Sequence, residues 1–144
     1  MKKRTLLLVI ALLGVAPAAF AQEPRPYKEG PLVEISYIKI KPGKFDDYMK
    51  YLAGPYRDLM EANKKAGLVT SYAVYGNRAR NAQDPDMYLT ITYPNWAALD
   101  RVEESIAIAA RVAGTAATRD RAYADRGTMR EVLGSNVVQE LTLK

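Results

Sequence analysis

The chain has 144 residues and a formal net charge of +5, from 21 Lys and Arg against 16 Asp and Glu. One domain with a core of its own is expected at this length. The absence of His and Cys excludes Ser-His-Asp and Cys-His catalysis, His-based zinc or haem sites, disulfides and thiol chemistry.

The first 21 residues have the anatomy of a secretory signal peptide. Residues 1–4 carry three cations, residues 5–16 form an apolar run, and Ala19-Phe20-Ala21 is a small-x-small cleavage site. An uncleaved membrane anchor is the alternative, but the 17 uncharged residues from Thr5 to Ala21 fall short of the roughly 20 that a spanning helix needs. We therefore expect cleavage before Gln22 and a periplasmic or secreted protein.

Charge is nearly balanced in the rest of the chain. Residues 22–144 hold 18 cations and 16 anions, a net charge of +2. The late cationic segment contains Arg111, Arg119, Arg121, Arg126 and Arg130, interleaved with Asp120, Asp125 and Glu131. Ion pairs on a helix surface account for this pattern. The sequence thus predicts no nucleic-acid partner, and no membrane association after signal cleavage.

The first part of the mature chain predicts a leader, a strand and a helix. Residues 22–31 contain three prolines and little apolar character, which indicates an extended leader, with the ordered domain starting near Leu32. Residues 33–40 form a predicted strand that is apolar on both faces. An amphipathic helix is predicted from Phe45 to a stop at Gly67, with a kink or division at Gly54-Pro55.

A hairpin is predicted next, with strands over residues 68–75 and 86–93. The polar loop between them, residues 77–85, holds Arg78 and Arg80, which are typical of a solvated loop, although a grip on a carboxylate or phosphate is the alternative. Asp84-Pro85-Asp86 predicts a turn and the start of a strand rather than a cation site.

The last part of the chain predicts two helices and a closing strand. Asn95 is a predicted N-cap for a helix that carries Trp96 and ends before Gly114. A further helix is capped by Thr115 or Thr118 and runs to about Leu133. Residues 134–136, Gly-Ser-Asn, predict a turn into a strand over residues 137–143.

The order of predicted elements is β, α, β, β, α, α, β. This order predicts an α+β fold, the ferredoxin-like antiparallel sheet with helices on one face, in a single domain over residues 32–144. The first strand is apolar on both faces, so the uncovered side of the sheet is expected to be apolar as well. A second copy packing its sheet on that side would explain such a face in a soluble protein.

The segment from Val33 to Tyr48, and the Pro94-Asn95-Trp96 junction after the third strand, resemble the dimeric α+β barrel superfamily. The nearest likeness is to its NIPSNAP-like and antibiotic-biosynthesis-monooxygenase-like branches. The resemblance implies a homodimer with a small-molecule cavity between sheet and helices in each subunit. It implies no single activity, because the superfamily includes enzymes, haem binders and proteins without known chemistry.

Four aromatic residues are the candidate ligand-binding residues. The resemblance suggests a pocket with an Asn, a Trp and a His, but this chain has no His, which disfavours haem degradation through an axial His. A phenol in an apolar cavity can hydrogen-bond a carbonyl or phenolic ligand. The candidates are Tyr37, Tyr72, Tyr88 and Trp96, with packing in the core as the competing role for each. We predict no metal site and no cofactor.

Three functions are compatible with these features. The first is an exported homodimer that binds a small apolar or aromatic molecule in the cavity. The second is a cofactor-independent oxygenase or isomerase, whose base would be a carboxylate, Tyr or Lys, with Glu34 and Glu140 as the only strand-borne carboxylate candidates. The third is a structural or interaction module of the cell envelope, which a domain without a sizeable cavity would favour.

Overall fold

The computed structural model describes residues 24–144, and the predicted signal peptide lies outside the described residues. The strands are β1 (Tyr27–Ile40), β2 (Ser71–Gly76), β3 (Met87–Tyr93) and β4 (Arg130–Leu143). The helices are α1 (Phe45–Tyr51), a π-helical turn η1 (Leu52–Tyr56), α2 (Arg57–Lys65), a 3-10 turn η2 (Trp96–Ala98), α3 (Val102–Ala113) and α4 (Ala116–Met129). Within the described range, none of these helices has the length and apolarity needed to cross a membrane.

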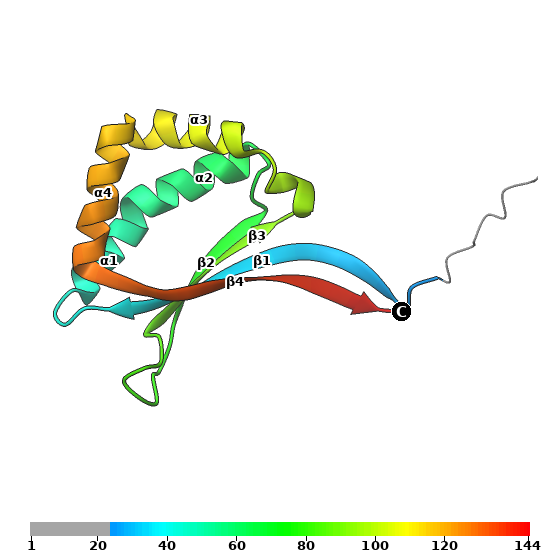
Figure 1. The fold of residues 1–144 in the computed structure, drawn as a ribbon, viewed down its shortest axis with the longest axis horizontal. Helices are drawn as coiled ribbons and strands as arrows, with labels where there is room; N and C mark the ends of the chain where they lie inside the picture. The colour runs from blue at the N-terminus through cyan, green and yellow to red at the C-terminus, as the bar shows by residue number, and fades with distance from the viewer. Residues whose placement is uncertain (1–23) are drawn as a thin grey trace, which may run out of the picture.

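The four strands form one antiparallel sheet in the order β2-β3-β1-β4. All the helices lie on one side of this sheet, and the other side carries none within the described chain (Figure 1). This arrangement is the ferredoxin-like α+β fold, so the predicted fold class is confirmed.

Strand pairing defines which side chains face the helices. Ile38 of β1 pairs with Met87 of β3, and both are buried under the helices. Side chains alternate along a strand, so Ile35 and Tyr37 of β1 point to the opposite, open face. There Tyr37 pairs with Tyr88. Both faces of the central strand are therefore apolar, as the sequence predicts.

Strand β1 begins at Tyr27 rather than near Leu32, so residues 27–31 are part of the sheet and not a leader to it. Tyr27 and Glu29 pair with Leu143 and Leu141 of β4. Pro31 lies at a shift in the register between Glu29 and Leu32, where its missing N–H removes no regular ladder bond. The prolines of this segment indicated a leader. The sequence did not reveal the strand, because the segment that pairs with it lies more than a hundred residues away.

Strand β4 begins at Arg130, so the predicted turn over residues 134–136 is wrong. Gly134, Ser135 and Asn136 instead pair with Tyr37, Ser36 and Ile35 of β1. The hydrogen-bond ladder with a central strand outweighs the turn preference of a Gly-Ser-Asn sequence. The preceding helix α4 consequently ends at Met129 and not near Leu133.

Apart from the earlier end of α4, the helices agree with the predicted pattern except at the start of α3. The division at Gly54-Pro55 is confirmed, because η1 separates α1 from α2 there. Thr115 caps α4 by accepting a hydrogen bond from the backbone N–H of Thr118. Asn95 caps the 3-10 turn η2 rather than a long helix, and α3 begins only at Val102.

Candidate functional site

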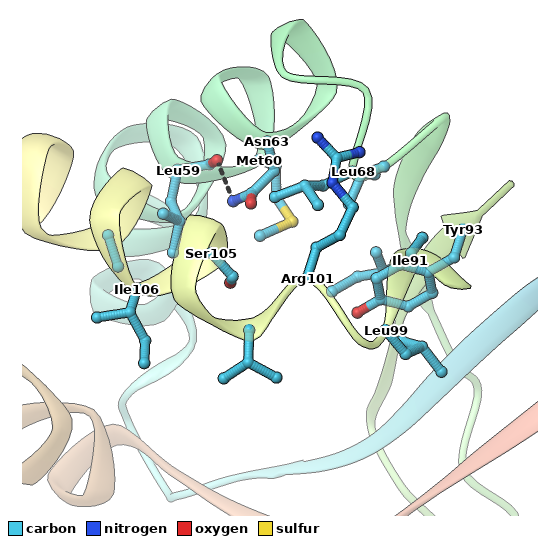
Figure 2. A pocket seen from close by; sticks show the side chains of 14 residues that line it. Leu59, Met60, Asn63, Leu68, Ile91, Tyr93, Leu99, Arg101, Ser105 and Ile106 are labelled. Carbon is cyan, nitrogen blue, oxygen red and sulfur yellow. Dashed lines mark hydrogen bonds between the residues drawn. The ribbon is translucent and has the colours of Figure 1, made fainter. Parts of the chain in front are cut away.

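The first cavity, which we call the apolar cavity, lies between α2, α3 and the sheet and has a volume of about 300 Å³ (Figure 2). Its wall consists mainly of aliphatic side chains with a few polar groups. The lining residues are Leu59, Met60, Asn63, Leu68, Val69, Ile91, Tyr93, Ala98, Leu99, Arg101, Val102, Ser105, Ile106 and Ala109.

Polar groups in the apolar cavity are anchored to the surrounding protein. The Asn63 side chain, 7% exposed, donates a hydrogen bond of 2.8 Å to the Leu59 carbonyl (Figure 2). The Tyr93 hydroxyl donates one of 2.8 Å to Glu34, and burial, followed by this hydrogen bond, raises the pKa of Tyr93. Tyr93 is therefore a neutral hydrogen-bonding group at physiological pH.

Arg101 holds one rim of the apolar cavity in place. Its guanidinium donates to the carbonyls of Ala66 and Gly67, which follow α2, at 3.3 and 3.4 Å. The same guanidinium forms an ion pair with Glu104 in the first turn of α3. A cation at a helix C-terminus is favourable, so Arg101 links the end of α2 to the start of α3.

The second cavity, which we call the tyrosine–arginine cavity, has a volume of about 230 Å³. It lies between α1, η1, α4 and the sheet. Its lining residues are Ser36, Tyr48, Tyr51, Tyr56, Leu59, Met60, Leu89, Ile91, Arg126 and Arg130. Leu59, Met60 and Ile91 line both cavities, so the two are neighbours separated by these side chains.

Aromatic rings orient the two arginines of this cavity. The rings of Tyr48 and Tyr51 stack with centroids 5.9 Å apart. Arg130 lies over the Tyr48 ring at 5.7 Å, and Arg126 lies over the Tyr51 ring at 5.4 Å. Arg126 also donates a hydrogen bond of 2.6 Å to the Tyr51 hydroxyl. These contacts hold both guanidiniums by their faces and the Arg126 guanidinium also by one nitrogen.

Burial leaves several polar atoms of this cavity without a hydrogen-bond partner in the described chain: the hydroxyls of Tyr48 and Tyr56 and the Nε atoms of Arg126 and Arg130. Burial also raises the pKa of Tyr48, an effect that the nearby Arg130 partly opposes. For Tyr56, burial is again the largest cause of a raised pKa. Both phenols are consequently neutral donors at physiological pH.

The structure places the four predicted site residues outside the walls of these two cavities. Tyr37 and Tyr88 meet edge to face on the open side of the sheet, with centroids 5.6 Å apart. Tyr72 faces the helices, where its ring packs edge-on against Tyr56. Its hydroxyl donates to Glu61, and this hydrogen bond raises the pKa of Tyr72. Trp96 is 53% exposed, so it is not a core anchor of the single chain.

The two strand-borne carboxylates differ in position. Glu34 is half-buried on the helix face and bonds Tyr93 of the apolar cavity, whereas Glu140 is exposed. Glu34 is thus the carboxylate that lies one hydrogen bond from a cavity wall. Within residues 24–144, no cluster of three or more Asp, Glu, His or Cys side chains could hold a metal ion.

Sequence reasoning missed the residues of the tyrosine–arginine cavity. Tyr48 and Tyr56 fit the apolar face of the predicted helix, and Arg126 and Arg130 fit a charged helix surface. One signal was available in the sequence: Tyr48 and Tyr56 occupy apolar positions of the helical repeat that a Leu would fill equally well. A second signal was the spacing of Arg126 and Arg130, four residues apart, which places both on one side of the helix that the sequence predicts to run to about Leu133.

Comparisons with known proteins bear on the fold. No family model matches the sequence, and no curated protein matches it. The structure resembles HapK from Hahella chejuensis, with a TM-score of 0.50 and 13% identity, over 76% of this chain and 91% of that chain. It resembles protein SO0527 from Shewanella oneidensis with a TM-score of 0.52 and 16% identity, over 81% of this chain and 98% of that one. These two matches agree with the ferredoxin-like α+β fold described above.

A further similar structure is a dimeric ferredoxin-like protein of unknown function from Thermobifida fusca, with a TM-score of 0.32 and 12% identity, over 79% of this chain and 92% of that chain. At such identities a likeness to solved structures concerns the fold alone. The function has to be argued from the two cavities.

Proposed function

We propose that the protein is an exported homodimer that binds a small, mainly apolar organic molecule between its sheet and its helices. The apolar cavity is the observation that carries this proposal. Its volume of about 300 Å³ lies at the lower end of the range for small-molecule sites, and its aliphatic wall with a few anchored polar groups is typical of them. A cavity of this size argues against a purely structural module, whose core would be closely packed.

Export and dimerisation rest on different parts of the chain. The cationic, apolar and small-residue regions of residues 1–21 support export. The open face of the sheet supports a dimer, because it presents Val33, Ile35, Tyr37 and Val138 on the side without helices (Figure 1). Apolar patches of this kind on soluble proteins mark interaction surfaces.

Filling the apolar cavity with a larger side chain should weaken ligand binding. Ala109 lines the cavity and is half-buried, while the next residue of α3, Ala110, is exposed and lies outside it. We expect Ala109→Phe to weaken binding of N-phenyl-1-naphthylamine, a neutral fluorescent dye, by about tenfold or more. Ala110→Phe should bind the dye like the wild type. Fluorescence titration measures both, and thermal unfolding verifies that both variants fold.

Equal binding by the two variants would show that the dye occupies another surface, and no dye binding by the wild type would refute the proposed apolar ligand. The comparison of the two variants is decisive because they add the same side chain at adjacent positions of one helix, and only one of these positions lines the cavity.

A second candidate function, a cofactor-independent oxygenase or isomerase, is favoured by the Glu34–Tyr93 hydrogen bond at the edge of the apolar cavity. A carboxylate in that position can act as a base toward a bound molecule. Incubating the protein with the molecule it retains, and following conversion by mass spectrometry, tests this function. Conversion that is lost in Glu34→Gln would support it, and an unchanged molecule would count against it.

A further inference from the structure

The tyrosine–arginine cavity carries positive charge without a counter-charge in its wall. Arg126 and Arg130 line it, and the other lining residues include no Asp or Glu. Among the described residues, no ion pair involves either guanidinium. Burying a cation without a carboxylate beside it costs free energy. A bound anion would supply the missing negative charge at this wall.

Hydrogen-bond donors in the same wall also lack partners. Buried polar groups are nearly always hydrogen-bonded in folded proteins, yet two hydroxyls and two Nε atoms here have no partner in the part of the chain that the structure describes. The Tyr48 side chain is fully buried and that of Tyr56 is 9% exposed, so water does not reach them freely. Guanidinium Nε–H groups only donate, and protonated phenols can donate as well. Four buried donors beside this cavity thus lack an acceptor among the described residues, and the wall itself holds no Asp or Glu.

We infer that the tyrosine–arginine cavity binds the carboxylate of a small aromatic or aliphatic acid. This inference rests on the proposed function and names the chemical class of its ligand. A carboxylate offers two oxygens that together accept several hydrogen bonds, and a guanidinium matches it geometrically. Phenol hydroxyls from Tyr48 and Tyr56 would satisfy the remaining acceptor positions.

The rest of the wall indicates an organic acid rather than an inorganic anion. Aliphatic surface in the wall comes from Leu59, Met60, Leu89 and Ile91. A phosphate would lose hydrating water against this surface and gain no hydrogen bonds from it in return. The volume of about 230 Å³ limits the charged end of the ligand to a small group. Leu59, Met60 and Ile91 also line the apolar cavity, so the aliphatic wall that the ligand would contact here has the apolar cavity on its other side.

Calorimetric titration of the purified protein with benzoate, benzamide and inorganic phosphate tests the inference. Benzoate and benzamide share a ring and differ in charge. We expect benzoate to bind about tenfold tighter than benzamide or more, since a hydrogen bond to a charged group contributes more than a neutral one. Phosphate should bind more weakly than benzoate because it lacks an apolar part.

Variants of the wall sharpen the test. Arg130→Met removes the charge and keeps the length of the side chain, and we expect it to weaken benzoate binding by about tenfold to a hundredfold. Arg121→Met is the matched control, because Arg121 is exposed on α4 and lines neither cavity. Tyr56→Phe should weaken benzoate binding while leaving thermal stability unchanged or higher, because it removes a hydroxyl that has no partner among residues 24–144.

Equal affinities for benzoate and benzamide, tighter binding of phosphate, or unchanged benzoate binding in Arg130→Met would each overturn the inference. Lack of benzoate binding by the wild type would overturn it too. Titration with N-phenyl-1-naphthylamine separates this failure from that of the proposed function. Dye binding without benzoate binding refutes only the acid, whereas absence of both refutes the apolar ligand as well.

Discussion

Asp86, at the end of the long hairpin loop, ties this loop to the central strand. One carboxylate oxygen accepts a hydrogen bond of 2.8 Å from the backbone N–H of Ile40, and the other pairs with Lys39 at 3.0 Å. Burial acts to raise the pKa of Asp86, but these two bonds outweigh it, and the pKa is lowered. The predicted turn and strand start at this position is thus reinforced by a specific carboxylate contact.

Replacing Asp86 should therefore destabilise the fold in a pH-dependent way. We expect Asp86→Asn to lower the free energy of unfolding by about 1 kcal/mol at pH 7. Because the folded-state pKa lies below the unfolded value of about 3.9, the stabilisation is present above that pH and is lost as the pH falls through the folded-state pKa. Urea unfolding at several pH values measures this. A pH-independent difference, or an equal effect of the exposed control Asp100→Asn, would contradict the assignment.

At the scale of the elements, the π-helical turn η1 explains how one long helix keeps four residues buried. Tyr48, Leu52, Tyr56 and Met60 lie at steps of four residues. In an uninterrupted α-helix such residues drift around the axis by about 40° per step. The wider turn around Pro55 reverses this drift, because a π-turn holds more residues than an α-turn. Tyr56 thereby joins Tyr48 at the tyrosine–arginine cavity.

The pairing of strand ends gives the element-scale prediction. A Cβ atom added at Gly30 would lie 3.1 Å from Cβ of Glu140 on β4, whereas one added at Gly134 would meet nothing within 4 Å. We expect Gly30→Ala to lower the free energy of unfolding by about 1 kcal/mol and to speed hydrogen exchange at residues 27–29. Gly134→Ala should leave both unchanged. Fast exchange at residues 27–29 in the wild type would mean that this segment is a leader after all.

The limits of sequence prediction follow from the same elements. The period of the helix from Phe45 and the alternation over residues 33–40 are local patterns, so the order of elements and the fold class could be predicted. The pairing of Tyr27 with Leu143 is not local, and no pattern within either segment reports it. The tyrosine–arginine cavity needed the structure, because only the chain's folding brings Arg130 of β4 onto the ring of Tyr48 in α1.

At the scale of the whole molecule, the helices lie on one side of the sheet (Figure 1), and helix residues on that side line both cavities. The other side is the face on which we propose that a second copy packs. Val137 and Val138 of β4 are 44% and 46% exposed and point to opposite faces. Val138 pairs with Val33 on the open face, so a charge there would be buried in a dimer. Val138→Glu should therefore separate the two copies, and Val137→Glu should not.

Native mass spectrometry of the protein purified from the cells that make it tests the central claim, a homodimer that holds a small organic acid. We predict the mass of two chains that begin at Gln22, with a small molecule released on denaturation, and a dimer that persists in Val137→Glu and is lost in Val138→Glu. The retained molecule should be reduced or absent in Ala109→Phe and Arg130→Met. A monomer without a retained molecule would contradict the account.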